Sequence, residues 1–244
     1  MMRRTVDVMT IPAAPDLDRH VTLPALLFRC LLVSACAGWA FGAVTVALNM
    51  ASWGPLTGVA AVVGGAAGWA GAGWGWAYVI GRRYGRWPVS AAAAAVFLLA
   101  ASMAYYSVEA AWSLVRLRTM EPPAYPVPGG DLGYLDASWV ELMAGATGEL
   151  VLWGTVSVLA GVALGVVTSA ARRSGVMGLL SRLTLPVGVL LWSGVLLHFE
   201  LGIQPRPAVV TAHVLAGLMA LGAAVVLLQR KRTAVQHRRT MFEG

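Results

Sequence analysis

Residues 147–170, TGELVLWGTVSVLAGVALGVVTSA, decide the fold class of this chain. The stretch carries one charged side chain, Glu149, and it ends just before the pair Arg172 and Arg173. A helix rises about 1.5 Å per residue, so about 20 apolar residues cross a hydrocarbon layer that is roughly 30 Å thick. Backbone polar groups find no water in lipid, and the stretch lacks the alternation that is typical of barrel strands. It therefore predicts a transmembrane helix.

The same pattern recurs along the chain. Five further apolar stretches are long enough to cross a membrane: 25–48, 57–80, 88–111, 183–200 and 207–228. Overall, 58% of the residues are hydrophobic and 12% are charged, whereas soluble domains carry about 25% charged residues. The sequence thus predicts an all-α polytopic membrane protein with six transmembrane helices, and it excludes a water-soluble core as the main architecture.

Basic residues are divided unequally between the two ends of these helices. If the N-terminus is cytoplasmic, that side receives 15 of the 18 Lys and Arg residues, and the opposite side receives only Arg116, Arg118 and Arg206. The positive-inside rule then places both termini of a multi-pass protein in the cytoplasm. The arginine-heavy composition, rich in Ala, Gly, Val and Trp, suggests a bacterial source and hence a bacterial plasma membrane. Because the basic residues flank apolar segments, we expect membrane lipids as partners and no nucleic acid.

The predicted organisation is simple. Residues 1–20 form a disordered cytoplasmic arm, residues 21–232 form the six-helix bundle with an external loop at 119–138, and residues 233–244 form a basic tail. Val33 to Cys36 resembles the end of a lipoprotein signal. However, the apolar run continues past Cys36 to Leu48, which favours a retained first helix over a cleaved signal.

Small residues predict where helices pack. Gly64, Gly68, Gly71 and Gly75 lie on one face of the second predicted helix. Small side chains at this spacing let two helix backbones approach closely. We therefore expect a packing seam along the helix, with Gly38/Gly42 and Gly161/Gly165 as partner surfaces.

Ionisable residues gather at one depth. Glu109 lies 23 residues beyond Arg86, and Glu149 lies 23 residues before Arg172, which places both about 34 Å from the cytoplasmic arginines. The same counting places Glu200 and His213 near this level. Charged groups inside a membrane by default suggest function, although helix tilt would put them among lipid headgroups instead. Glu149 is followed by apolar residues, so it is the first candidate to hold or deliver a proton.

Aromatic residues lie just below this layer. Three tryptophans fall near mid-membrane, and Trp153 follows Glu149 by one turn. Their side chains either fill space opposite glycine or wall a pocket for an apolar or cationic guest. The candidate substrate-binding residues are Trp39, Trp69, Trp153, Trp192, Tyr105, Tyr106 and His213. No HExxH or His/Cys cluster is present, so we predict neither a metal site nor a cofactor.

Several motifs support a resemblance to a known family. They are Trp53-Gly-Pro-Leu, the helix ending in Arg82-Arg83, Ala104-Tyr105-Tyr106, and residues 160–165 followed by Arg172-Arg173. Over roughly residues 30–200 the chain resembles a family of uncharacterised actinobacterial integral membrane proteins, which implies a small helical bundle in the plasma membrane. In size and helix number alone it also resembles the integral-membrane terpene cyclases.

Three functions fit these features. The first is a metal-free cyclase of a bilayer-dissolved isoprenoid, in which protonated Glu149 starts the reaction, Glu109 or Glu200 assists, and the indoles stabilise the cation. The second is a membrane transport component, or a subunit of a proton-coupled transporter, in which the carboxylates relay protons or cations. The third is a scaffold or sensor whose basic tail binds anionic lipid or a cytoplasmic partner. The sequence favours the cyclase, with a lipophilic small molecule as the ligand. It does not predict an oligomeric state.

Overall fold

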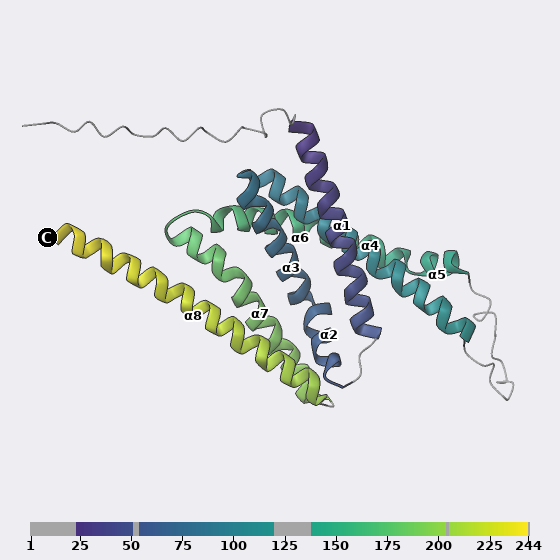
Figure 1. Ribbon diagram of the computed structural model, residues 1–244. Helices are drawn as coiled ribbons and strands as arrows, with labels where there is room; N and C mark the ends of the chain where they lie inside the picture. The colour runs from purple at the N-terminus through teal and green to yellow at the C-terminus, as the bar shows by residue number, and fades with distance from the viewer. Residues whose placement is uncertain (1–22, 51–53, 120–137, 204, 244) are drawn as a thin grey trace, which may run out of the picture.

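The computed structural model describes residues 23–50, 54–119, 138–203 and 205–243, and these residues form helices and no strands (Figure 1). The arm predicted at 1–20 and most of the external loop fall outside this part. The helices are α1 (Leu23–Met50), α2 (Leu56–Gly64), α3 (Ala66–Tyr84), α4 (Trp87–Thr119), α5 (Trp139–Gly145), α6 (Thr147–Ala171), α7 (Val176–Gly202) and α8 (Pro207–Glu243).

The structure confirms an all-helical chain in which several helices are long and apolar enough to cross a membrane. Five helices are long and apolar enough to cross a membrane, and the number is six if the bent pair α2 and α3 counts as one span. The continuous helix predicted over 57–80 is wrong, because α2 and α3 meet at a break with a 61° bend. The second span therefore consists of a short helix of 9 residues and a longer one of 19 residues that meet at Gly65.

Helix α4 is the centre of the bundle. In its most apolar window 61% of the residues are buried, compared with 17% to 28% in the other four long helices. The reason lies in its sequence, since the run from Ala91 to Ala95 lets neighbouring backbones approach from two sides. Helices α1 and α6 both pack along it, and Figure 1 shows α6 running beside α4 in the opposite direction.

Glycines on α1 and α6 make these contacts possible. A Cβ atom on Gly38 would lie 2.0 Å from the carbonyl oxygen of Phe97, and one on Gly165 would lie 2.3 Å from the Cα atom of Ala91. Their helical neighbours Gly42 and Gly161 approach α4 in the same way. The small-residue surfaces on α1 and α6 therefore pack against α4, and not against the glycine-rich second span as we expected.

Two arginines connect helix ends on the side that is predicted to be cytoplasmic. The Arg172 guanidinium group donates to the carbonyl oxygen of Gly81 in the last turn of α3, and Arg182 Nε donates to the carbonyl oxygen of Ala171 at 2.7 Å. The last carbonyls of a helix lack partners within the helix and carry partial negative charge. Arg172 and Arg182 therefore cap the C-terminal ends of α3 and α6.

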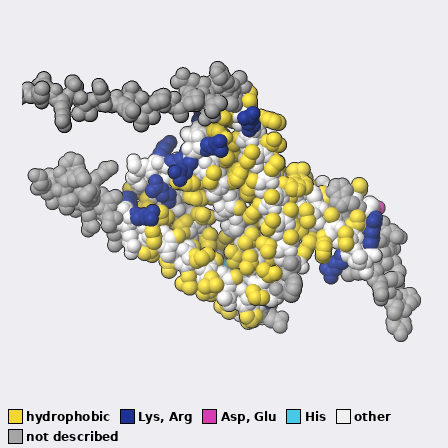
Figure 2. Space-filling model, viewed as in Figure 1, with side chains coloured by type: hydrophobic (Ala, Val, Ile, Leu, Met, Phe, Trp, Pro, Cys, Tyr) yellow, Lys and Arg dark blue, Asp and Glu magenta, His cyan; other side chains and the backbone are white. Residues whose placement is uncertain are grey.

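Helices α7 and α8 form an antiparallel pair, and α8 also packs against α2 (Figure 1). A Cβ atom on Gly58 of α2 would lie 2.3 Å from the carbonyl oxygen of Ala208. Helix α8 continues to Glu243, so it extends past residue 232, where we predicted the bundle to end and the basic tail to begin. Hydrophobic side chains cover the middle of the visible face (Figure 2), as expected for a surface in contact with lipid.

The short helix α5 was not predicted, and it begins with a capping box. The backbone N–H and the hydroxyl group of Ser138 donate to Glu141 Oε2 at 2.6 and 2.9 Å, while the Glu141 N–H donates to Ser138 Oγ at 3.3 Å. The two side chains thus satisfy N–H groups that have no partner within the helix. The donors from Ser138 also hold the pKa of Glu141 below its usual range.

Acid is therefore expected to loosen α5. The lowered pKa means that the stabilisation by Glu141 is complete above the pKa of an unfolded glutamate and is lost as the pH falls through the folded value. Backbone amides of α5 should exchange hydrogen faster at pH 3 than at pH 6, after correction for intrinsic rates. Glu141→Gln should exchange at nearly the same corrected rate at both pH values, and a wild-type rate that does not change would contradict this account.

Candidate functional site

The break between α2 and α3 is the feature that creates a site. Gly65 has φ −76° and ψ 165°, which is extended backbone between two helical segments. A Cβ atom on Gly65 would lie 2.7 Å from the Ala61 carbonyl oxygen, and one on Gly68 would lie 2.3 Å from the Val63 carbonyl oxygen. Both glycines are therefore needed because the two half-helices touch at the bend. The predicted face of four glycines serves this bend and is not a continuous packing seam.

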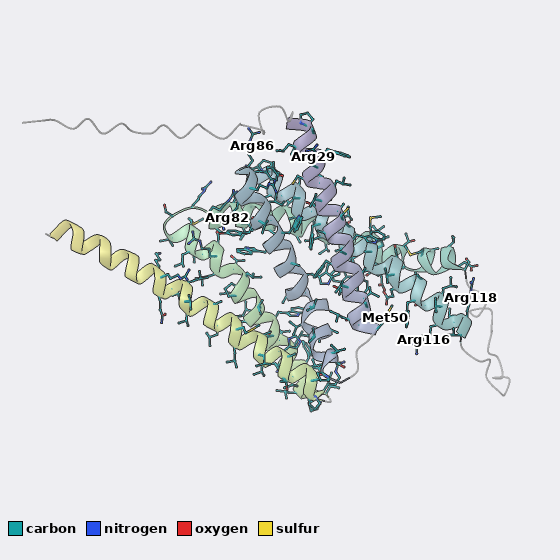
Figure 3. The ribbon with its side chains drawn as sticks, viewed as in Figure 1. Arg29, Met50, Arg82, Arg86, Arg116 and Arg118 are labelled. Atoms are coloured by element: carbon teal, nitrogen blue, oxygen red, sulfur yellow. The ribbon has the colours of Figure 1, made fainter. Side chains whose placement is uncertain are left out.

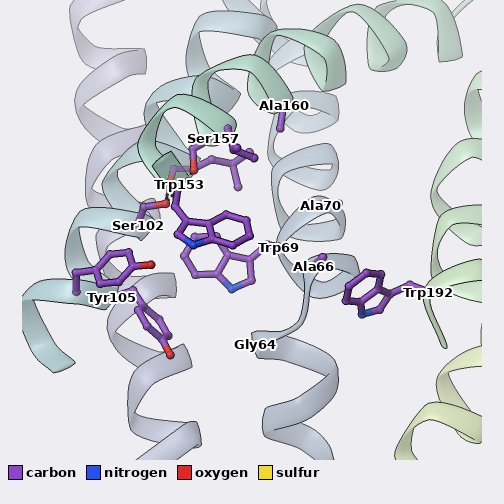
Figure 4. Close-up of a pocket in the computed structure, with 13 residues that line it drawn as sticks. Gly64, Ala66, Trp69, Ala70, Ser102, Tyr105, Trp153, Ser157, Ala160 and Trp192 are labelled. Atoms are coloured by element: carbon purple, nitrogen blue, oxygen red, sulfur yellow. Dashed lines mark hydrogen bonds between the residues drawn. The ribbon is translucent and has the colours of Figure 1, made fainter. Parts of the chain in front are cut away.

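A pocket of about 520 Å³ opens beside the break (Figure 4). It lies between the α2–α3 break, α4, α6 and α7. Its lining residues are Gly64, Ala66, Trp69, Ala70, Leu98, Ser102, Tyr105, Tyr106, Trp153, Val156, Ser157, Ala160 and Trp192. Five helices, α2, α3, α4, α6 and α7, thus line one partly open cavity that is large enough for a small organic molecule.

Aromatic rings supply much of the wall. Trp69 packs edge-on against Tyr105, with ring centroids 6.1 Å apart, and Tyr105 contacts Tyr106 at 5.5 Å. The ring of Phe41 in α1 packs edge-on against Trp69, with ring centroids 5.6 Å apart. Edge-to-face contacts of this kind hold rings in fixed orientations. The faces that remain are suited to flat apolar groups and to cations.

The hydroxyl groups of Ser102, Ser157 and Tyr105 in the pocket already have partners, whereas the buried indole N–H of Trp192 has none among the described residues. Ser102 and Ser157 hydrogen-bond to each other at 2.9 Å, and both side chains are buried. The Ser102 hydroxyl also approaches the Leu98 carbonyl oxygen at 3.1 Å, and the amide of Asn49 donates to the Tyr105 hydroxyl at 3.2 Å. A guest therefore does not have to satisfy these hydroxyl groups, which favours a mostly apolar molecule, and the Trp192 N–H is available to donate to one acceptor on it.

Five predicted substrate-binding residues lie together in this lining: Trp69, Trp153, Trp192, Tyr105 and Tyr106. Trp39 does not, because it lies about 100° around α1 from Gly38, which faces α4. Its side chain is 46% exposed on the outer surface of the bundle. The prediction that Trp39 lines the pocket is wrong.

His213 also lies away from the pocket. It belongs to the buried stripe of α8 that includes Val209 and Ala216, and it is 2% exposed. Neither ring nitrogen has a hydrogen-bond partner among the described residues. The prediction that His213 contacts the ligand is wrong, because α8 uses this face to pack within the bundle. Among the described residues, no group of three or more His, Cys, Asp or Glu side chains could hold a metal ion.

The three predicted carboxylates do not gather around the hollow. Glu109 and Glu149 are exposed and are absent from the lining, although each acts on the other electrostatically. Glu149 is also close enough to Tyr106, which does line the pocket, to act on it electrostatically. These two carboxylates therefore stand beside the tyrosine end of the pocket and not inside it.

Glu200 is part of a different group. A short turn after α7 brings Arg206 back toward it, and Arg206 Nε donates to Glu200 Oε2 at 3.1 Å. The carboxylate raises the pKa of Arg206 further above its usual value. Because its charge is neutralised by this pair, Glu200 is not a third acid of the pocket, and that part of the prediction is wrong.

Two features of the site were missed in the sequence. The first is the break itself, for which the adjacent Gly64 and Gly65 were the available signal. The second is the pair Ser102 and Ser157, which had no signal because the two residues come from different helices. No protein-family model, curated protein or solved structure matches the chain, so the family resemblance drawn from its motifs stays a prediction.

Proposed function

We propose that this protein is a membrane transport component that binds a lipophilic small molecule in the pocket at the α2–α3 break. The observation that carries the proposal is the coincidence of an interrupted span with an aromatic cavity. In many secondary transporters the substrate site is formed by discontinuous helices near the middle of the membrane. The bend between α2 and α3 is an interruption of this kind.

The ligand we propose is largely apolar, with lipophilic cations preferred over anions. The ring faces of Trp69 and Trp153 attract cations as well as apolar groups. Glu109 and Glu149 stand beside the tyrosine end of the pocket and give it negative potential. Because neither carboxylate lines the cavity, they favour the approach of a cation and leave the inside of the pocket apolar.

Binding of tetraphenylphosphonium, a lipophilic cation, is the first test. Trp153→Ala should weaken its binding to the purified protein at least tenfold, because a cation–ring contact and an apolar wall are lost together. Trp39→Ala removes an indole that lies outside the pocket and should bind within twofold of wild type. Equilibrium dialysis against empty micelles of the same detergent measures both. Equal affinities for the two variants would contradict the assigned site.

Flux separates transport from binding alone. Proteoliposomes should accumulate tetraphenylphosphonium under an imposed pH gradient, at a rate that falls in Trp153→Ala and is retained in Trp39→Ala. The double variant Glu109→Gln/Glu149→Gln should bind the cation several-fold more weakly at low salt, and the difference should shrink at high salt as the exposed charges are screened. Uptake no faster than in empty liposomes would overturn the transport proposal.

A second candidate is the metal-free cyclase. It is favoured by one observation, the link from Glu149 through Tyr106 to the cavity. In that reaction a proton adds to an alkene carbon, the resulting cation closes a ring by carbon–carbon bond formation, and loss of a proton from the product cation balances the step. Full product formation by Glu149→Gln from an isoprenoid substrate would exclude Glu149 as the acid.

A further inference from the structure

Charged side chains are separated between the two ends of the described bundle. Figure 2 shows dark blue Lys and Arg side chains gathered on the end where α1 begins and α3 ends. Glu109, Glu141, Glu149 and Glu200, the carboxylates whose side chains the structure describes, all belong to the opposite ends of their helices. None of these four carboxylates therefore supplies a counter-charge to the basic end.

Some of these arginines already have structural partners and some do not. Arg172 and Arg182 cap helices through backbone carbonyl groups. In contrast, Arg29, Arg83 and Arg86 are exposed, and their guanidinium groups form no hydrogen bond or ion pair among the described residues. Figure 3 shows Arg29 and Arg86 on the same end of the molecule, far from Arg116 and Arg118. We call Arg29, Arg83 and Arg86 the arginine rim.

A buried hydrophobic cluster lies beneath the arginine rim. Cys30 of α1 packs with Ile80 of α3 and Val89 of α4 in one buried cluster, and Tyr84 packs against it. Arg29 precedes Cys30 in the chain, and Arg83 is close enough to Cys30 to act on it electrostatically. Arg83 also lies 5.8 Å from the centre of the Tyr84 ring. The backbone positions of Arg29 and Arg83 are thus held by one packed junction, and the Arg83 guanidinium group also contacts the Tyr84 ring.

Apolar side chains adjoin the rim on the outer surface. Phe28, next to Arg29, is 67% exposed, and Leu32, one turn further along α1, is 52% exposed. Trp87, next to Arg86, is 52% exposed and has the amphipathic ring that is typical of the membrane interface. The surface therefore combines cations at the interface with apolar side chains deeper along the helices, which is the arrangement of a phospholipid headgroup and its acyl chains.

We propose that the arginine rim is a binding site for an anionic phospholipid of the cytoplasmic leaflet, with the phosphate between α1 and the α3–α4 turn. Guanidinium groups bind phosphate oxygens through paired N–H donors. Each basic residue near an anionic membrane surface contributes roughly fivefold in affinity, so three contribute about a hundredfold. This proposal is independent of the function of the pocket.

Native mass spectrometry of the full chain with added phosphatidylglycerol or phosphatidylcholine of identical acyl chains tests the site. Wild type should bind phosphatidylglycerol at least tenfold more tightly than phosphatidylcholine. The variant Arg29→Gln/Arg83→Gln/Arg86→Gln should lose most of that preference and bind phosphatidylcholine as before. The matched control Arg116→Gln/Arg118→Gln removes exposed arginines at the other end and should keep the wild-type preference.

Three outcomes would overturn the proposal. The first is equal binding of phosphatidylglycerol by the wild type and the triple variant. The second is an equal loss in the control. The third is a fall in thermal stability of the triple variant that is the same in both lipids, which would indicate that residues 1–22 of the chain and not a lipid occupy the rim. If the triple variant does not fold, the single variant Arg86→Gln should still show a loss of roughly fivefold.

Discussion

The variant Gly68→Ala is expected to bind tetraphenylphosphonium at least tenfold more weakly than wild type, although it adds only one methyl group. That methyl group would lie 2.3 Å from the Val63 carbonyl oxygen and 2.5 Å from that of Val62. These atoms belong to the backbone of α2, so the clash is relieved only if the bend opens. Trp69, the next residue, lines the pocket and would move with α3.

Gly75→Ala is the matched control for this prediction. Gly75 lies on the same helix, and a Cβ atom there meets nothing within 4 Å. Alanine is favoured over glycine inside a helix by about 0.5–1 kcal/mol, so Gly75→Ala should gain thermal stability and keep its affinity. Wild-type affinity in Gly68→Ala, measured by the same dialysis, would show that the bend does not shape the pocket.

The break also marks the limit of what hydropathy can predict. Apolar composition identified the second span. Composition does not reveal a bend, however, because the half-helices on both sides of the bend are apolar. Gly64 and Gly65 weaken the helix locally, while Gly68 permits the bend by lacking a Cβ atom at one close contact. Which glycine in such a run has this role depends on tertiary geometry that a single sequence does not contain.

Depth along a helix was predictable, whereas the face was not. Counting residues from the cytoplasmic arginines placed Trp69 and Trp192 near mid-membrane and Trp153 just below Glu149, and the structure brings all three to one pocket. The same counting placed Trp39 near mid-membrane as well, but its rotation about α1 turns it outward. The rotation of a helix about its axis depends on which neighbouring helices pack against it. The sequence indicates this rotation only where a glycine such as Gly38 marks the face that contacts another helix.

The carboxylates show a third limit. Glu109 and Glu149 were expected to meet because their depths agree, and they do interact electrostatically. Glu200 has a comparable depth, but its partner is Arg206, six residues away along the chain. A local ion pair forms wherever a short turn allows it, so an acid near a loop arginine should be assigned to that pair before it is assigned to a shared site.

Replacing Gly42 by leucine should have the largest effect on folding. A Cβ atom at this position would lie 2.1 Å from the Ala101 carbonyl oxygen and 3.0 Å from the Ala101 Cα atom. These are backbone atoms of α4, the most buried helix, so α1 would have to separate from it. Overpacking commonly costs 1–3 kcal/mol. With about 3 kcal/mol lost, the midpoint of thermal unfolding should fall by about 6–12 °C for a chain of this size.

Gly222→Leu separates this contact from the general effect of the substitution. Gly222 is exposed on α8, and a Cβ atom there meets nothing within 4 Å. It should therefore unfold at or above the wild-type temperature, since leucine has the higher helix propensity. Unfolding followed by circular dichroism in the same detergent compares the two variants. If both variants unfold at the same temperature, the close approach of α1 to α4 does not stabilise the bundle. The packing of other helices against α4 would then not be the main source of its stability.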